Sequence, residues 1–506
     1  MTDEHAGHSD REASPADAFM TDQEVATDQT VAEIPEEPAS AVVVESADLS
    51  MLDNRPSAGE PAVYFFPKFD RFRLDNGLTV MAAHTPGRPL LAANLIMAGG
   101  GSGEPDDLAG VTMLTGRALA EGTAKRDAVA FIEASERLGA ELHADASWDT
   151  LTATMEVPRS RFGAALALMA EMVLEPALPE SEIERLRDER LNDLLQARAN
   201  PRRHSERVFP ETIYDAQSPY RRPLGGVAET VSRVDRDAVV ARHRLSGNPA
   251  RATLVVAGDL AGLDMEAIVN EQLGGWPDGG GAQSAGPTWP STHAAANPAG
   301  RRVVLVDRPG AAQSELRVGH VGLPRRTPDF YAVSVLNAIL GGIFDSRLNR
   351  VIREEKGYSY SIWSAFEMRR AAGPFVIRTA VETDVTAPAL TDIFNIVREM
   401  CETEVEPREL DTARDYLVGV FPLRFEVPAQ VAAALAGLVV NELPDDELDH
   451  YRPAIAAVSA ANVLDVAQRH IRPADMAVVI VGDAAKIEGP LRDADLGPLT
   501  VIPPDA

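Results

Sequence analysis

The chain has 506 residues, of which 45% are apolar and 25% charged, a composition typical of globular domains and not of fibrous or disordered chains. Its formal net charge of −29 repels phosphate backbones and anionic surfaces, so we expect no nucleic-acid partner. The single cysteine, Cys401, cannot form an internal disulfide, and no window is long and apolar enough for a membrane helix. Residues 1–20 lack the apolar core of a secretory signal, which favours a cytoplasmic protein without a membrane partner.

The first 60 residues carry fifteen acidic side chains against only Arg11 and Arg55. A segment with so much like charge and so few apolar groups cannot offset its ordering entropy by burial. We therefore predict a disordered acidic tail over residues 1–60. His5 and His8 lie within it, and we expect no physiological metal site there.

The remainder reads as two similar halves, residues 61–273 and 301–506, joined by a Gly- and Pro-rich linker over residues 274–300. The strand-like pattern ending in Gly258 recurs 224 residues later, ending in Gly482. A repeat with a constant offset over this length indicates duplicated domains.

Each half begins with the same predicted elements in chain order. A Pro-Gly turn, at residues 85–87 and again at 308–310, separates two strand-like runs. A strand (residues 91–97; 315–321), a polar loop and an apolar-periodic helix (residues 108–120; 330–340) follow. The pattern predicts an α+β class in which each half is a mixed or antiparallel sheet with helices packed on one face.

Several common catalytic arrangements are missing from the sequence. None of the ten histidines has another histidine four residues away, the spacing that places two imidazoles on one helical face. There is also no Gly-x-Ser-x-Gly elbow and no phosphate-binding Gly-x-x-x-x-Gly-Lys loop. For an independent enzyme the only candidates are scattered, such as His143 with Asp145 and Asp149.

Several motifs nevertheless occur together in the two halves. The first half contains Phe72–Val80, Ala98–Glu104, Gly110–Thr123, Pro219-Tyr220 with Gly225, and Gly258-Asp259. The second half contains Ser346-Arg347-Leu348 and the run Arg353–Ser361. These motifs resemble those of one family, the M16 metallopeptidases of the pitrilysin and mitochondrial processing peptidase type. The resemblance extends over about residues 68–500 and implies two M16-type domains that form half of a clamshell.

The family's zinc motif, His-x-x-Glu-His, is replaced in this chain. Aligned on Gly110 and Gly122, the motif positions hold Met113, Gly116 and Arg117. The family's third ligand is a glutamate roughly 76 residues further on, a count that here ends at Asp193. Thioether sulfur is a poor zinc ligand, glycine supplies no base, and a guanidinium has no lone pair to donate. The resemblance therefore implies that this chain binds no metal and is inactive by itself.

Two interpretations of the altered site stay open. Either the lost site drifted to core and surface residues, or Arg117 places a fixed positive charge where the metal would be and pairs with Asp193. The second interpretation predicts that the two side chains approach within hydrogen-bonding distance.

Arg353 and Tyr360 occupy the positions of the arginine and tyrosine that bind the substrate backbone in members of the family. Gly357 is expected to end the helix that carries Arg353, and Tyr358, Tyr360 and Ile362 to share one face of a strand. Both side chains are donors suited to a peptide carbonyl.

The chain lacks the metal ligands but keeps the arginine and tyrosine that bind substrate in members of the family. This combination is expected where two different chains each supply part of one active site. The resemblance thus implies the non-catalytic subunit of a heterodimeric M16 peptidase, whose partner carries His-x-x-Glu-His and the zinc. Arg353 and Tyr360 would then act in trans on a peptide substrate. The alternative is a purely structural M16-like subunit with no role in proteolysis.

Overall fold

The computed structural model describes residue 59 and residues 62–277, 294–296 and 300–504. Apart from Gly59, the predicted acidic tail therefore lies outside the described residues, as does most of the predicted linker. Of the linker, Trp276 is buried in the core of the first half, and its indole nitrogen donates to the Gly247 carbonyl at 3.2 Å. The packed part of the first half thus continues at least to Trp276.

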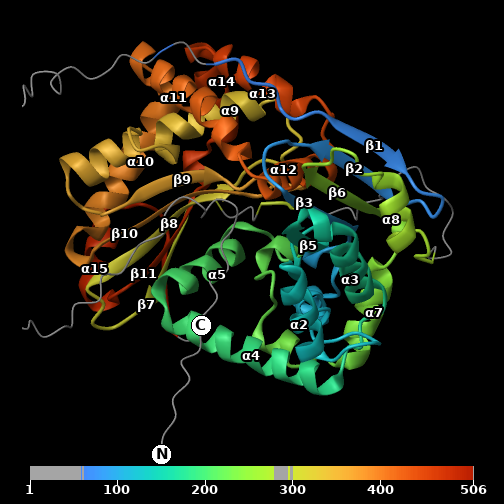
Figure 1. The fold of residues 1–506 in the computed structure, drawn as a ribbon. Helices are drawn as coiled ribbons and strands as arrows, with labels where there is room; N and C mark the ends of the chain where they lie inside the picture. Colours follow the sequence, from blue (N-terminus) through green and yellow to red (C-terminus); the bar gives the residue numbers. More distant parts are fainter. Residues whose placement is uncertain (1–58, 60–61, 278–293, 297–299, 505–506) are drawn as a thin grey trace, which may run out of the picture. The chain divides into compact units, whose positions relative to one another are not determined.

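The first half forms a six-stranded mixed sheet in the order β1-β2-β6-β3-β5-β4 (Figure 1). The pair β2 and β6 is parallel, and the other neighbours are antiparallel. Strand β6 is buried at every position, which suits the Thr- and Val-rich interior of a sheet covered on both faces. The strands are β1 (Phe69–Arg73), β2 (Thr79–His84), β3 (Leu90–Ala98), β4 (Glu141–Ala146), β5 (Thr150–Pro158) and β6 (Ala252–Gly258).

With the exception of α5 (Pro201–Ile213), the helices of the first half supply the apolar residues that cover one face of this sheet. Their buried side chains join Leu91, Leu95 and Leu254 of the strands in a single core. The helices are α1 (Val111–Ala118), α2 (Ala128–Leu138), α3 (Phe162–Leu174), α4 (Glu180–Ala199), α5 (Pro201–Ile213), α6 (Ala228–Val231), α7 (Arg236–Ser246) and α8 (Met265–Leu273).

The second half builds an equivalent sheet in the order β12-β7-β11-β8-β10-β9. Here β11 and β12 both run parallel to β7, and the remaining pairs are antiparallel. The strands are β7 (Arg302–Asp307), β8 (Gln313–Val321), β9 (Ile362–Phe366), β10 (Pro374–Glu382), β11 (Ala477–Gly482) and β12 (Leu499–Ile502).

With the exception of α12 (Pro428–Val440), the helices of the second half pack on one face of that sheet around a core that includes Leu316, Val318 and Phe375. Two of its helical segments are π-helical: η7 (Ala338–Gly342), which continues α9, and η8 (Asn349–Glu355). The α-helices are α9 (Phe330–Asn337), α10 (Thr386–Glu402), α11 (Pro407–Val420), α12 (Pro428–Val440), α13 (Glu447–Ala456), α14 (Ala460–His470) and α15 (Ala484–Asp493).

The two halves repeat one another, as the constant offset predicts. Strands β6 and β11 hold the third position of their sheets, and helix α7 at Arg236 corresponds to α14 at Ala460. The two sheets differ at one edge. In the first sheet the edge strand β1 comes before β2 in the chain and is antiparallel to it. In the second sheet the edge strand β12 is the last strand of the chain and is parallel to β7. The predicted α+β architecture with two related domains is confirmed.

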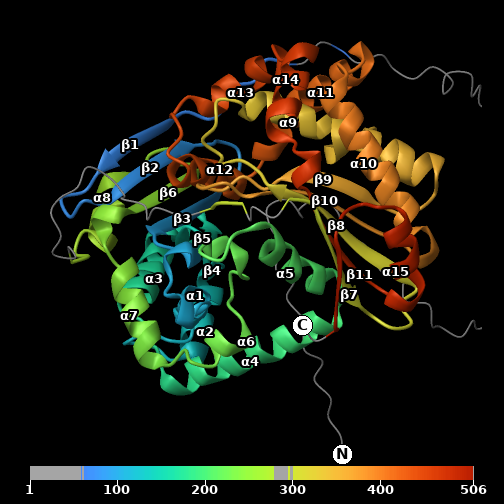
Figure 2. The ribbon, with the colours of Figure 1, turned by 180° about the vertical axis from the view of Figure 1, so that it is seen from behind.

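The face of each sheet that its own helices leave open is covered by a helix of the other half (Figure 2). Val431 and Leu435 of α12 pack on Met81 and Ile96 of the first sheet. Reciprocally, α5 packs on the second sheet, where buried Arg317 of β8 donates to Ser205 and Glu206 of α5 at 2.8 Å each. This exchange is why residues 61–506 form one unit and not two.

Within the described residues, no single helix has both the length and the apolarity needed to cross a membrane. The segments Pro407–Phe425 and Pro428–Val440 meet those requirements only when joined, and they are bent by 112° at the break between them.

Candidate functional site

Helix α1 begins at a glycine and is anchored by a buried carboxylate. Gly110 has φ +98°, and a Cβ there would lie 2.7 Å from the carbonyl oxygen of Gly225. The Glu104 carboxylate accepts hydrogen bonds from the backbone nitrogens of Gly110 (3.0 Å) and Thr112 (2.7 Å), where an anion complements the helix N-terminus. Arg222 holds this carboxylate from the other side at 3.1 Å. The helix that would carry a zinc motif is therefore firmly placed.

The three predicted zinc-motif positions share one stretch of α1 but offer no ligand set. Met113 is buried at 5% exposure, and Gly116 is buried as well. A Cβ on Gly116 would lie 3.0 Å from the Leu151 side chain and 3.3 Å from the Asp145 Cα atom of β4. The described residues contain no group of three His, Cys, Asp or Glu side chains that could hold a metal ion. The residues present do not fit zinc, because Met113, Gly116 and Arg117 supply no ligand set. Since position 116 has no side chain, α1 also lies close to β4.

Asp193 lies on α4 and is held by two arginines. Its carboxylate binds Arg190 at 2.5 Å, one helical turn earlier, and Arg203 of α5 at 2.8 Å. Burial acts to raise the pKa of Asp193, but the hydrogen bond from Arg203 and the charges of Arg190, Arg203 and Arg117 outweigh it, so the pKa is lowered. Arg117 therefore contributes to the field at Asp193, while their direct pairing stays a prediction.

Arg190 is the residue near this site that the sequence did not single out. Its side chain is 7% exposed, and its Nε donates to the Gly225 carbonyl at 3.0 Å. A Cβ on Gly225 would lie 2.4 Å from the guanidinium, so only glycine fits there without a shift. The sequence pointed to this contact only indirectly. Gly225 belongs to one of the family motifs, but the motif does not predict that the buried side chain of Arg190 packs against it.

Arg353 belongs to η8, which ends before Gly357 in the left-handed conformation at φ +63°. Its side chain is 24% exposed and pairs with Glu354 at 3.1 Å. The guanidinium lies 3.8 Å from the ring centroid of Phe344, an aromatic side chain that is 65% exposed. The sequence correctly predicted a helix that stops at Gly357, but it gave no signal for the contact with Phe344.

Tyr360 lies in the connection between η8 and β9, and its side chain is 83% exposed. The prediction that Tyr358, Tyr360 and Ile362 share one face of a strand was wrong, because β9 begins only at Ile362. Ser359 bonds locally to the backbone of Ser361, at 2.7 Å to its carbonyl oxygen, and this local bond turns the chain before the strand. Tyr358 instead packs against the core of the second half.

The scattered candidates for an independent enzyme site do not assemble into one. His143 of β4 is exposed, and its Nε2 atom lies 2.7 Å from the Thr154 hydroxyl. Asp149 is buried in the turn before β5, and burial raises its pKa against the opposing charges of Arg370 and Arg369. This carboxylate lies at a contact between the halves, since Arg369 of the second half stacks on Trp148 at 4.9 Å.

Two family models match the chain in order. Residues 79–225 match the insulinase family, peptidase family M16, and residues 233–417 match the peptidase M16 inactive domain. Together the two matches cover more than half of the chain. The second match begins at residue 233, before the predicted linker, and so also includes β6 and α8 of the first half.

Known proteins resemble the chain over most of its length. An uncharacterized zinc protease of Mycobacterium tuberculosis is 25% identical over 433 residues, 85% of this chain and 96% of that protein. A non-peptidase homolog of Helicobacter pylori, YmxG, is 23% identical over 404 residues, 79% of this chain and 90% of the homolog.

Solved structures share the fold. A peptidase M16 inactive domain from Pseudomonas fluorescens has a TM-score of 0.75 at 24% identity, covering 82% of this chain and 98% of its own. A protease from Helicobacter pylori has a TM-score of 0.77 at 18% identity, covering 83% of this chain and 100% of its own. Matched by both M16 domain models in sequence order and sharing this architecture, the chain belongs to the M16 peptidase family.

Proposed function

We propose that this protein is the non-catalytic subunit of a two-chain M16 peptidase and that it helps to bind the peptide cut by its partner. The observation that carries the proposal is the contrast between two regions. Helix α1 is rigidly placed yet holds Met113, Gly116 and Arg117, whereas Arg353 and Tyr360 remain at the surface of the second half. One relative, YmxG of Helicobacter pylori, is named a non-peptidase homolog, which agrees with a subunit that is not catalytic.

In this proposal the zinc belongs to the partner chain, which carries His-x-x-Glu-His. This chain contributes donors: the exposed Tyr360 hydroxyl and the Arg353 guanidinium can each donate to a peptide carbonyl. Arg353 is currently paired with Glu354 and stacked on Phe344. A bound peptide would have to compete with the Glu354 contact, which is solvent-exposed and therefore weak.

The second candidate function is a structural subunit without a role in proteolysis. The contacts of Arg353 with Glu354 and Phe344 favour this function, because they already give the guanidinium a carboxylate and an aromatic partner in the absence of a substrate. The two functions differ in one respect, which is whether turnover by the complex depends on Arg353 and Tyr360.

The test is reconstitution with a chain that carries the intact zinc motif. Mixing should give peptide hydrolysis that neither chain shows alone, and Arg353→Ala or Tyr360→Phe should each lower kcat by about 10²- to 10³-fold without dissociating the complex. The double variant should lose less than the product of the two effects, since both donors would hold one substrate. Arg350→Ala, on the same helix and 55% exposed, is the matched control and should retain activity.

Two outcomes would contradict the proposal. Full activity of the double variant in the complex would leave only the structural role. Full activity of the zinc-bearing chain by itself would do the same.

Metal content is the second test and needs this chain alone. Because Met113, Gly116 and Arg117 offer no ligands, the purified protein with His5→Ala and His8→Ala should contain no stoichiometric zinc by elemental analysis. It should also fail to cut unstructured peptides. One equivalent of zinc in that variant would refute the argument from the altered motif.

A further inference from the structure

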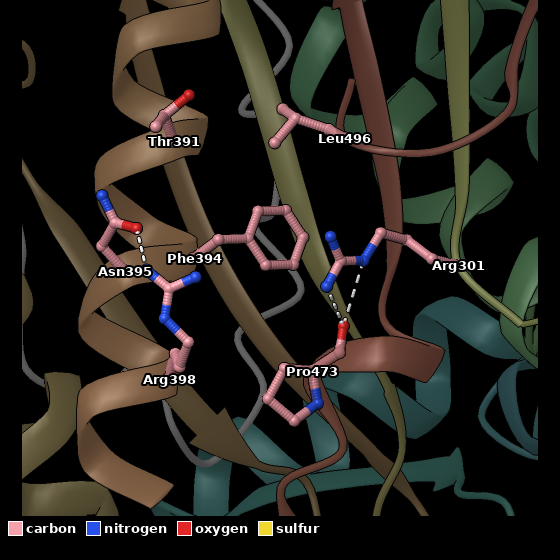
Figure 3. Close-up of a pocket in the computed structure, with 7 residues that line it drawn as sticks. All are labelled: Arg301, Thr391, Phe394, Asn395, Arg398, Pro473 and Leu496. Atoms are coloured by element: carbon pink, nitrogen blue, oxygen red, sulfur yellow. Dashed lines mark hydrogen bonds between the residues drawn. The ribbon is translucent and has the colours of Figure 1, made fainter. Parts of the chain in front are cut away.

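The second half contains a pocket of about 190 Å³ whose lining includes neither Arg353 nor Tyr360 (Figure 3). It lies between α10, the segment that enters β7, the turn before β11 and the connection that follows α15. Its lining residues are Arg301, Thr391, Phe394, Asn395, Arg398, Pro473 and Leu496. A volume of this size exceeds by far the roughly 15 Å³ needed to hold one water, so it can take a small organic molecule.

One wall of the pocket is formed by side chains on a single face of α10. Thr391, Phe394, Asn395 and Arg398 are spaced at i, i+3, i+4 and i+7 and therefore project from the same side of the helix. The Asn395 side-chain oxygen accepts a hydrogen bond from the Arg398 Nη2 atom. This bond fixes one edge of the guanidinium and leaves its other donors available.

The opposite wall carries a second arginine whose orientation is fixed. Arg301 donates from Nε (3.1 Å) and Nη2 (2.7 Å) to the carbonyl oxygen of Pro473. Its guanidinium lies 4.4 Å from the centroid of the Phe394 ring. Figure 3 shows the two guanidinium groups on either side of that ring. The pocket is thus lined by two positioned cations and an aromatic surface.

Neither cation has an acidic partner within 4.0 Å in the part of the chain that the structure describes, although acidic residues outnumber basic ones by 77 to 48. In the same half, Arg347 and Arg325 are both paired with glutamates. Burial, and then the like charge of Arg398, lower the pKa of Arg301. Arg301 is half-buried and Arg398 is exposed at the rim, so the two like charges repel one another through partly screened surroundings, and a bound anion would relieve that repulsion.

We propose that this pocket binds a small ligand through an oxyanion group, carboxylate or phosphate, held between Arg301 and Arg398. Guanidinium forks bind such groups with paired hydrogen bonds, which is the geometry that both arginines can offer. Phe394 and Leu496 give the remainder of the ligand an apolar surface. The site is independent of the proposed role in proteolysis, since it includes neither Arg353 nor Tyr360.

The first experiment measures binding of inorganic phosphate and of succinate to the full chain by calorimetry at constant ionic strength, with chloride as the balancing anion. Both probes carry the oxyanion, and their relative affinities distinguish phosphate from carboxylate ligands. Arg398→Gln should weaken the tighter probe by about tenfold or more, the usual size of one charge-assisted contact. Arg408→Gln, an exposed arginine on α11 with the same change in charge, should leave affinity unchanged.

Either of two results would overturn the proposal. One is the absence of binding by both probes up to about 10 mM, which is weaker than a built site of two arginines should give. The other is equal weakening by Arg398→Gln and Arg408→Gln, which would mean adventitious attraction to positive charge.

A charge reversal tests the geometry without any ligand. Because the charge of Arg398 acts on Arg301, Arg398→Glu should replace a repulsion by an attraction and raise the thermal midpoint in phosphate-free buffer. The same variant should lose the rise in midpoint that phosphate or succinate gives to the parent protein. A lower midpoint than that of Arg398→Gln would contradict the proposed arrangement.

Discussion

The carboxylate of Asp193 binds two arginines, Arg190 of its own helix and Arg203 of α5. Arg190 is almost fully buried, so its charge depends on this partner far more than that of Arg203, which is 38% exposed. The contact with Arg203 joins α4 to α5.

Asp193→Asn should therefore destabilise the protein. We expect a loss of about 2 kcal/mol in the free energy of unfolding, a value reduced because the Asp193 side chain is 36% exposed. Since the pKa of Asp193 is lowered by folding, its contribution is present above the unfolded pKa and is lost as pH falls through the folded value. Asp188→Asn, on the same helix and 70% exposed, should change stability by less than about 0.5 kcal/mol in urea melts.

A double-mutant cycle addresses the predicted pair of Arg117 and Asp193. If the two side chains interact directly, Arg117→Met and Asp193→Asn should show a coupling of about 0.5 to 3 kcal/mol in the free energy of unfolding. Additive effects would favour the simpler interpretation, in which Arg117 only drifted into a vacated position.

Substitutions at position 116 test whether the glutamate of the zinc motif could be restored without destabilising the protein. Gly116→Glu must place a Cβ 3.0 Å from Leu151 and then fit a longer side chain beside the β4 backbone, so we expect a loss of about 1 to 3 kcal/mol in thermal or urea unfolding. Gly116→Ala should cost less than Gly116→Glu, because the gain in helix propensity acts against the tight contacts of one added Cβ with Leu151 and the Asp145 backbone. Equal stability of the two variants would show that β4 moves aside at little cost.

At the scale of elements, the motif Ser346-Arg347-Leu348 has a structural role. Arg347 is 7% exposed and donates from Nε (2.8 Å) and Nη2 (2.7 Å) to the two carboxylate oxygens of Glu409 at the start of α11. This paired hydrogen bond fixes the segment before η8 against α11. It therefore supports the backbone that presents Arg353.

Arg347→Met should leave Glu409 without its cation and lower the free energy of unfolding by about 3 to 5 kcal/mol at neutral pH. Burial acts to raise the pKa of Glu409, but the hydrogen bonds and charge of Arg347 outweigh it, so the pKa is lowered in the folded state. The contribution of the pair is thus present above the unfolded pKa and lost as pH falls, and the difference between variant and parent should shrink in acid.

Glu399→Gln is the control for this pair. Glu399 lies 3.8 Å from Arg347 but is 63% exposed, so its loss should change the free energy of unfolding by less than about 0.5 kcal/mol. Urea melts at neutral and acidic pH measure both variants. A pH-independent difference for Arg347→Met would exclude the charge interaction as its cause.

At the scale of the molecule, the exchange of α5 and α12 joins the two related halves. Leu435 of α12 is fully buried against the sheet of the other half, whereas Leu423 just before that helix is 60% exposed. Leu435→Ala should cost about 2 to 5 kcal/mol and lower one common unfolding transition, while Leu423→Ala should have little effect. If Leu435→Ala instead split the transition into two, the halves would be independent and the exchange would not couple them.

The sequence by itself determined the class and order of the elements. The repeat of Gly258 at Gly482 predicted two related sheets, and both glycines do end the third strand in each sheet order. Local periodicity suffices for this because strand and helix patterns reflect which side of each element is buried. The replacement of the zinc motif stays a prediction from residue types, because Met113, Gly116 and Arg117 lack the side chains that bind zinc.

Only the tertiary structure decided which partners these residues meet. The cover of each sheet by a helix of the other half, the burial of Arg190 behind Gly225 and the stacking of Arg353 on Phe344 all join residues that no sequence spacing relates. The strand expected at Tyr360 failed for a different, local reason, because Ser359 hydrogen-bonds to the backbone of Ser361 and β9 begins only at Ile362. Alternation and periodicity specify which face of an element is apolar, whereas long-range packing and paired charges specify what covers it.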